Sequence, residues 1–258
     1  MPEIESLSTG AHLWVLAVLV GSGFFHGLIG LGLPLIAMPL LALVLPFKAA
    51  VLFLMLPMLC VNVVTSLWGG RLRQSVLRFW YMLIAPVAGA WIGTRLLIGA
   101  PPEPFILVLA VMLVAYLARE RLGGAHVPLV LRHEVAFGVG AGLLGGFFES
   151  ITNVSLPPLV IYFMMLGLAP GPLVQMLNFQ SVGTKASQIA TWSISGGVPG
   201  SFWLAALPWA AATVAAVLAG TRIRTRVHPE RYMIWLRRFL WAMAALLVVQ
   251  FLHATLSS

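Results

Sequence analysis

Long apolar stretches occupy most of this 258-residue chain. A helix needs about 20 apolar residues to cross the hydrocarbon core of a bilayer, so the chain has room for about eight to ten membrane segments. Only 9% of its residues are charged, well below the fraction of a typical soluble domain. The chain is therefore predicted to be an all-α polytopic membrane protein, which excludes a water-soluble fold. The apolar stretches run over 11–47, 49–68, 79–98, 104–118, 135–169, 173–192, 202–219 and 234–253.

Two of these stretches, 11–47 and 135–169, are too long for a single crossing. Each is interrupted near its middle by residues that disfavour a helix, Gly27-Leu-Ile-Gly-Leu-Gly-Leu-Pro34 in the first and Ile151-Thr-Asn-Val-Ser-Leu-Pro-Pro158 in the second. Such breaks free backbone groups that lipid cannot satisfy, so each needs protein or water around it. We therefore predict two broken helical hairpins. Arms of about 16 residues would reach about 24 Å, which leaves open whether they cross the membrane or turn back within it.

The chain also repeats itself. Gly23-Phe-Phe-His26 returns as Gly146-Phe-Phe-Glu149. Further pairs follow in the same order and indicate two homologous halves over 1–118 and 135–258, joined by a linker over 119–134. Each half would contain one broken hairpin and three transmembrane helices. The other repeated positions are Pro34, Pro46 and Trp68 with Pro158, Pro170 and Trp192, Gly93-Thr-Arg95 with Gly220-Thr-Arg222, and Pro102-Glu103 with Pro229-Glu230.

The distribution of charge predicts how the halves are oriented. Three loops carry nearly all the arginines, and the positive-inside rule places these loops in the cytoplasm. Loops 69–78 and 193–201 hold equivalent places in the two halves, yet only the first is basic, so the repeats are predicted to be inverted and both termini to be periplasmic. Inverted halves with broken helices place a transport site at their interface. The arginines are Arg71, Arg73 and Arg78; Arg119, Arg121 and Arg132; and Arg222, Arg224, Arg226, Arg231, Arg237 and Arg238.

These features resemble the sulfite exporter TauE/SafE family of membrane permeases. The likeness lies in the glycine-rich hairpin Gly23-Phe-Phe-His-Gly-Leu-Ile-Gly-Leu-Gly-Leu-Pro34, in Leu45-Pro-Phe-Lys-Ala-Ala50 and in the second copy of this unit, and it covers essentially the whole chain. The resemblance implies a multi-pass secondary transporter of a bacterial inner membrane, which exports sulfite, an organosulfonate such as sulfoacetate, or a related sulfur anion. The chain departs from the family pattern at Glu149-Ser-Ile-Thr-Asn-Val-Ser155, where members commonly have another glycine-rich turn. A polar turn there could select a different substrate.

Lys185 is the first of the candidate site residues, because ionisable residues deep in a membrane are costly and usually functional. It lies near the middle of 173–192, and Asn178, Ser181 and Gln188 share its helix face by three- and four-residue spacing. A cationic, hydrogen-bonding face suits the oxygen cluster of sulfite or a sulfonate. The structural alternative is a Lys185–Glu149 ion pair that holds two helices together. The two interpretations are compatible if substrate or protons compete for the pair.

Glu149 and His26 are the candidates for proton coupling. Glu149 precedes the second break and corresponds in the repeat to His26 of the first. A buried carboxylate beside a cation could carry the coupling proton, or it could only neutralise Lys185. For His26, the alternative is that local hydrogen bonds satisfy it, as is usual for a lone histidine on an apolar face.

The breaks themselves offer further ligands for an anion. A helix N-terminus can bind an anion through its amides, and glycines let a ligand approach bare backbone, although tight helix packing is an alternative role for them. Polar side chains of neighbouring helices would complete a pocket near the bilayer midplane. The predicted substrate-binding residues are Lys185, Asn153, Thr152, Ser155, Asn178, Gln175, Asn62, Gly30 and Gly32.

Three function classes compete: a secondary anion transporter, an intramembrane enzyme, and a channel or scaffold protein. The sequence has no HExxH, GxSxG or GxxxxGK[ST] motif and no aspartate, and its single Cys60 allows no intramolecular disulfide. We therefore predict a transporter, not an enzyme, with no cofactor or metal. Its predicted partners are a small anion, the lipid bilayer and a coupling proton, with a homodimer as a further option and no nucleic acid. The alternatives are an anion channel and a permease for a non-sulfur anion such as a carboxylate.

Overall fold

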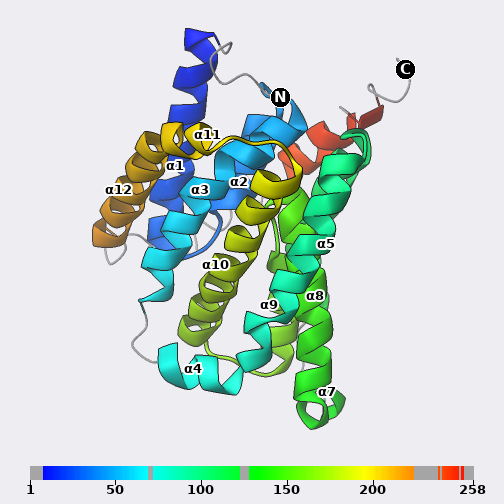
Figure 1. Cartoon of the computed structure of the whole chain (residues 1–258). Helices are drawn as coiled ribbons and strands as arrows, with labels where there is room; N and C mark the ends of the chain where they lie inside the picture. Colours follow the sequence, from blue (N-terminus) through cyan, green and yellow to red (C-terminus); the bar gives the residue numbers. More distant parts are fainter. Residues whose placement is uncertain are drawn as a thin grey trace.

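The computed structural model describes residues 8–68, 72–122, 128–223, 238, 240–249 and 251–252, and over these residues the regular structure is helical throughout (Figure 1). This confirms the all-α prediction. The elements are α1 (Thr9–Ile29), α2 (Leu33–Ala42), α3 (Phe47–Ser66), α4 (Leu72–Arg78), the 3-10 turn η2 (Trp80–Leu83), α5 (Ala85–Gly99), α6 (Glu103–Leu122), α7 (Pro128–Arg132), α8 (Glu134–Thr152), α9 (Leu156–Met165), α10 (Pro170–Ser195), α11 (Gly200–Ala205) and α12 (Leu207–Ile223), followed by a helical segment over Leu240–Val249.

Membrane insertion is supported by helix length and by the outer surface. Within the described residues, five helical segments are long and apolar enough to cross a bilayer. Large apolar side chains also lie on the outside of the bundle, among them Ile194, which is 85% exposed. A surface of this kind is stable against lipid, where apolar exposure carries no penalty. The five segments are Thr9–Ile29, Phe47–Ser66, Trp80–Gly99, Glu134–Thr152 and Gly200–Ile223.

Both breaks fall within the predicted regions, and left-handed residues form them. Gly30 ends α1 with φ 88° and Gly32 precedes α2 with φ 109°. Glycine adopts this conformation without steric penalty. In the second break Asn153 takes the same role with φ 60°, the one positive-φ residue other than glycine among those described. Asparagine is one of the few side chains that tolerate this region.

The hairpin arms are unequal, which differs from the prediction of two arms of similar length. α1 has 21 residues and α8 has 19, whereas the returning helices α2 and α9 have 10 each. The predicted break began at Gly27, but α1 continues through this residue to Ile29. Gly27 is a packing glycine: a Cβ on it would overlap the carbonyl oxygen of Val217 in α12.

Glycines allow two close helix crossings, each of which joins a helix of the first predicted half to a helix of the second. α1 packs along α12 and α5 packs along α8. In the first crossing, Gly220 faces the carbonyl oxygen of Phe24. In the second, Gly93 faces the carbonyl oxygen of Phe147, and Gly146 faces that of Pro86. Small residues at such contacts let helix backbones approach closely in lipid. Two related halves would pack in this way, and the inverted repeat stays a prediction from the sequence.

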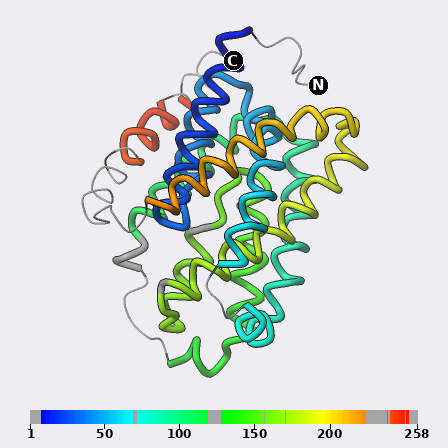
Figure 2. Tube along the Cα trace, turned by 90° about the vertical axis from the view of Figure 1, so that its left-hand side faces the viewer, coloured from blue at the N-terminus to red at the C-terminus, as the bar shows by residue number. Residues whose placement is uncertain are grey.

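The predicted loops gather at two opposite ends of the bundle. Figures 1 and 2 show α4 and α7 together at one end and α11 at the other. The first end carries the exposed Arg73 and Arg132, as expected for the cytoplasmic side. α7 and the end of α6 fall within the predicted linker. Residues 1–7, 224–237 and 253–258 lie outside the described residues, so the third basic loop and the predicted placement of the termini stay predictions.

Candidate functional site

The two hairpin breaks meet at a small polar cavity in the interior of the bundle. Its volume is about 20 Å³, and both breaks contribute to it together with α3 and α10. At this size it holds about one water molecule. Seven of the predicted site residues line the cavity. The complete lining is His26, Leu31, Gly32, Pro34, Met58, Asn62, Glu149, Asn153, Ser155, Leu177, Asn178 and Ser181.

Lys185 lies beside this cavity and has no exposed surface. Its Nζ donates to Oδ1 of Asn153 at 2.6 Å and to Oε1 of Gln188 at 2.9 Å. The same Nζ lies 3.6 Å from Oε1 of Glu149. Three acceptors thus surround the three N–H groups of the ammonium. The predicted Lys185–Glu149 pair is present, and it joins α10 to the end of α8.

Glu149 has two oxygens in different environments. Its Oε2 accepts hydrogen bonds from Oγ of Ser181 at 3.1 Å and from Nε2 of Gln180 at 3.3 Å. Its Oε1 has no hydrogen-bond partner among the described residues and is near only the Lys185 ammonium. Neutral donors therefore bind one oxygen of the carboxylate, and the Lys185 ammonium lies near the other.

Amide side chains donate hydrogen bonds to backbone carbonyl groups at both breaks. Nδ2 of Asn178 donates to the carbonyl oxygen of Gly30 at 3.1 Å, and Nε2 of Gln188 donates to that of Ser150 at 2.7 Å. Nδ2 of Asn153 donates in turn to the carbonyl oxygen of Val51 in α3 at 3.2 Å. These bonds satisfy carbonyl groups that the helix ends leave open. The predicted amide donors are therefore engaged with protein in this conformation.

Other residues supply hydrogen-bond donors that can face the cavity. Two buried side chains have polar atoms without a hydrogen-bond partner among the described residues. These atoms are Nδ2 of Asn62, a residue that is 4% exposed, and both ring nitrogens of His26, which is 3% exposed. His26 is thus not satisfied by local hydrogen bonds. The N-terminal turns of α2 and α9 also have no side-chain cap, and their N-cap residues Gly32 and Ser155 line the cavity. Such helix ends favour negative charge.

The remaining predicted residues lie next to the cavity without lining it. Thr152 donates to the carbonyl oxygen of Phe148 at 2.8 Å and accepts from the amide of Val154 at 3.2 Å, so it shapes the turn. Gln175 donates to the carbonyl oxygen of Ser66 at 3.0 Å and ties α10 to α3. Away from the cavity, Lys48 of α3 donates to the carbonyl oxygen of Ile98 at 3.1 Å.

The list of predicted site residues missed two glutamines of α10. Gln188 accepts a hydrogen bond from Lys185, and Gln180 donates one to Glu149. The sequence already placed Gln188 on the helix face of Lys185 by its three-residue spacing, although Gln188 is not among the predicted substrate-binding residues. Gln180 lies five residues before Lys185, and its role depends on where α8 packs.

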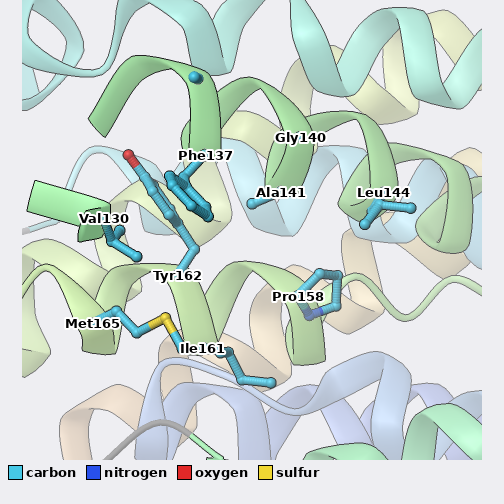
Figure 3. A pocket seen from close by; sticks show the side chains of 10 residues that line it. Val130, Phe137, Gly140, Ala141, Leu144, Pro158, Ile161, Tyr162 and Met165 are labelled. Carbon is cyan, nitrogen blue, oxygen red and sulfur yellow. The ribbon is translucent and has the colours of Figure 1, made fainter. Parts of the chain in front are cut away.

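An apolar groove of about 530 Å³ lies between α8 and α9 (Figure 3). Phe137, Ala141 and Leu144 of α8 face Pro158 and Ile161 of α9 across it. It has no charged residue in its lining, so it offers nothing to an ion in the membrane. Among the described residues, no group of three or more histidine, cysteine or acidic side chains is placed to hold a metal ion.

The helical bundle with two broken hairpins and buried charges at their meeting point is the architecture of a multi-pass membrane transporter. Comparison with protein families gives a specific assignment: the family described as sulfite exporter TauE/SafE matches residues 15–251. The chain belongs to this family, whose members are transporters and not enzymes. No curated protein and no solved structure matched the chain.

Proposed function

We propose that the protein is a secondary transporter of a small sulfur oxyanion, either sulfite or an organosulfonate such as sulfoacetate, in a bacterial inner membrane. The anion would bind where the two hairpin breaks meet, and export is the direction we propose. One observation carries the proposal: a fully buried lysine adjoins a cavity that is also lined by the N-cap residues of two helices without a side-chain cap and by two polar side chains without a partner among the described residues.

The balance of donors and acceptors favours an anion over a cation. Asn178 and Gln188 already occupy carbonyl oxygens at the ends of α1 and α8, so these acceptors are not free for a metal ion. Asn62 and His26 keep donor capacity toward the cavity. An oxyanion with several acceptor oxygens would complement such a site, because charge-assisted hydrogen bonds are the stronger ones.

The size of the cavity supports alternating access. A volume of about 20 Å³ accepts about one water molecule, which is smaller than an oxyanion of sulfur. The anion can enter only when the elements around the cavity separate. A transporter that opens to one side at a time behaves in this way, whereas an open anion channel would keep a continuous water-filled path.

Thermal stability in the presence of different anions tests the proposal. A ligand that binds only the folded protein stabilises it by about 2.7 kcal/mol at 100 times its dissociation constant. We expect sulfite, sulfoacetate or methanesulfonate to raise the melting temperature of the purified protein, and acetate to have no effect. A response to acetate alone would favour a carboxylate permease, and a response to no anion would contradict the anion site.

Lysine variants locate the site. The chain has two lysines. Lys185→Ala combined with Glu149→Gln removes the buried pair without leaving an unpaired charge, and we expect it to abolish the anion response. Lys48→Ala is the matched control, because Lys48 contacts the carbonyl oxygen of Ile98 away from the cavity and should leave the response intact. An unchanged response in the Lys185 variant would place the anion elsewhere.

A further inference from the structure

We propose that each anion binds together with one proton and that Glu149 carries this proton. The inference rests on the proposed function and specifies its coupling. Joint movement of one proton and one monovalent anion is electroneutral, so export would follow the outward concentration gradient of the anion, while a pH gradient would accumulate the anion on the alkaline side. It follows from the charges around the cavity and from the contacts of the two carboxylate oxygens.

The charge of the empty site is already balanced. Lys185 and Glu149 are both fully buried and lie 3.6 Å apart, so they form a neutral pair in the interior of the bundle. A monovalent anion added to this pair leaves one net negative charge away from water. Uncompensated charge in a membrane is strongly unfavourable. A proton that arrives with the anion restores neutrality.

Glu149 presents one oxygen to receive the proton. Oε2 already accepts bonds from Ser181 and Gln180, whereas Oε1 has no hydrogen-bond donor among the described residues, and the residue lines the cavity. In the step, an O–H bond forms between Oε1 and a proton from water on the open side. No bond of the anion breaks, and the proton returns to water when the anion leaves. The protonated Oε1 becomes a donor that an anion oxygen can accept.

Protonation of Glu149 also makes the charge of Lys185 available. Besides Glu149, the polar contacts of the ammonium within the described residues are with the oxygens of Asn153 and Gln188, which are neutral amides. Once Glu149 is neutral, nothing in this contact shell cancels the positive charge. In a medium of low dielectric constant that charge acts on the adjoining cavity. Proton and anion therefore favour the binding of each other, which is reciprocal coupling.

The other ionisable groups near Glu149 limit the alternatives. Lys185 faces it from α10, and His26 of α1 lines the same cavity with both ring nitrogens unpartnered among the described residues. On α5, which packs along α8, Arg95 is exposed and lies over the ring of Trp91. At the far end of α8, Glu134 pairs with Arg78. His26 is thus the one competing proton acceptor that faces the cavity in this part of the structure.

Binding calorimetry of the purified full chain tests the proposal with methanesulfonate, which stays a monovalent anion across the pH range used. The heat of binding is measured near pH 8 in buffers of different ionisation enthalpy, which gives the number of protons taken up per anion. We expect about one proton in the wild type, and an affinity that falls up to about tenfold for each unit of rising pH. This measurement needs no variant.

Two variants identify the proton acceptor. Glu149→Gln should bind the anion without proton uptake and with an affinity independent of pH, while His26→Gln should keep the uptake. In proteoliposomes, Glu149→Gln should exchange anion across the membrane but lose accumulation driven by a pH gradient.

The outcomes separate this inference from the proposed function. Anion binding by the wild type with no proton uptake overturns the coupling and leaves the anion site standing. Loss of uptake in His26→Gln, with uptake kept in Glu149→Gln, overturns the assignment to Glu149. Absence of methanesulfonate binding in the wild type overturns both this inference and the proposed anion site on which it rests.

Discussion

At the scale of single residues, polar side chains of α10 satisfy backbone carbonyl groups at and beside the two breaks. Asn178 and Gln188 donate to carbonyl oxygens of the two breaks, and Gln175 donates to that of Ser66. An unsatisfied backbone group in lipid costs roughly several kcal/mol. These amides are therefore needed to satisfy the carbonyl groups wherever water is absent. In the proposed alternating access, opening the site to water on one side would relieve this requirement and free the amides for an anion.

Two glycines of α8 provide a stability test at the same scale. A Cβ on Gly146 would overlap the carbonyl of Pro86, while one on Gly140 would meet no atom within 4 Å. We expect Gly146→Ala to destabilise the protein by about 1–3 kcal/mol through overpacking. Gly140→Ala should be neutral or stabilising by up to about 1 kcal/mol, from helix propensity. Melting temperatures compare the two, and equal values would contradict the close α5–α8 crossing.

At the scale of elements, each broken hairpin depends on residues in the left-handed conformation. The first break uses two glycines, Gly30 and Gly32. The second uses Asn153, which also accepts from Lys185 and donates to Val51. One side chain therefore sets the turn, holds the cation and joins α8 to α3. These three roles explain why the second break is polar where glycine would satisfy the backbone alone.

Substitutions of Asn153 separate these roles. Asn153→Gly keeps the turn but removes the amide and its buried bonds to Lys185 and Val51, so we expect a loss of about 1–3 kcal/mol of stability and weaker binding of methanesulfonate. Asn153→Ala should lose a further ~1–2 kcal/mol of stability, because alanine is strained at positive φ. Thermal unfolding and calorimetry measure the two effects. If the alanine and glycine variants unfold at the same temperature, backbone conformation is not what asparagine supplies here.

At the scale of the whole molecule, the end that carries α4 and α7 is closed by a hydrogen-bonded cluster. Nε and Nη2 of Arg78 each donate to a carboxylate oxygen of Glu134 at 3.0 Å. The hydroxyl groups of Tyr81 and Tyr162 lie 2.7 Å apart, and Tyr162 donates to the backbone oxygen of Glu134 at 3.0 Å. The cluster joins the end of α4 and η2 to the second hairpin. In the proposed alternating access, opening toward this end would separate these contacts.

Labelling of single cysteines tests the orientation of the molecule. In a Cys60→Ser background, Gln74→Cys lies on α4 and Ser201→Cys on α11, both at exposed positions. The positive-inside rule predicts that a membrane-impermeant maleimide labels Ser201→Cys in intact cells and Gln74→Cys only in inverted vesicles. The reverse pattern would invert the topology. Labelling of both from the same side would contradict the arrangement of the bundle.

The sequence by itself determined the features that depend on neighbouring residues. Apolar stretches of membrane length, interrupted at Gly30–Gly32 and near Asn153, specified the helices and their breaks, because hydrophobicity and backbone freedom act locally. The cost of an ionisable group in lipid marked Lys185, Glu149 and His26 as unusual. All three lie in or beside the cavity.

Only the tertiary structure decided how these residues are used. Asn178 reaches a carbonyl 148 positions away and Asn153 one 102 positions away, and no local pattern encodes such contacts. The unequal hairpin arms have the same origin, since Gly27 stays helical because it packs against α12. Which polar atoms remain free for an anion follows from this packing. The side chains of His26 and Asn62 keep unpaired polar atoms because the helices that meet around them offer no hydrogen-bond partner among the described residues.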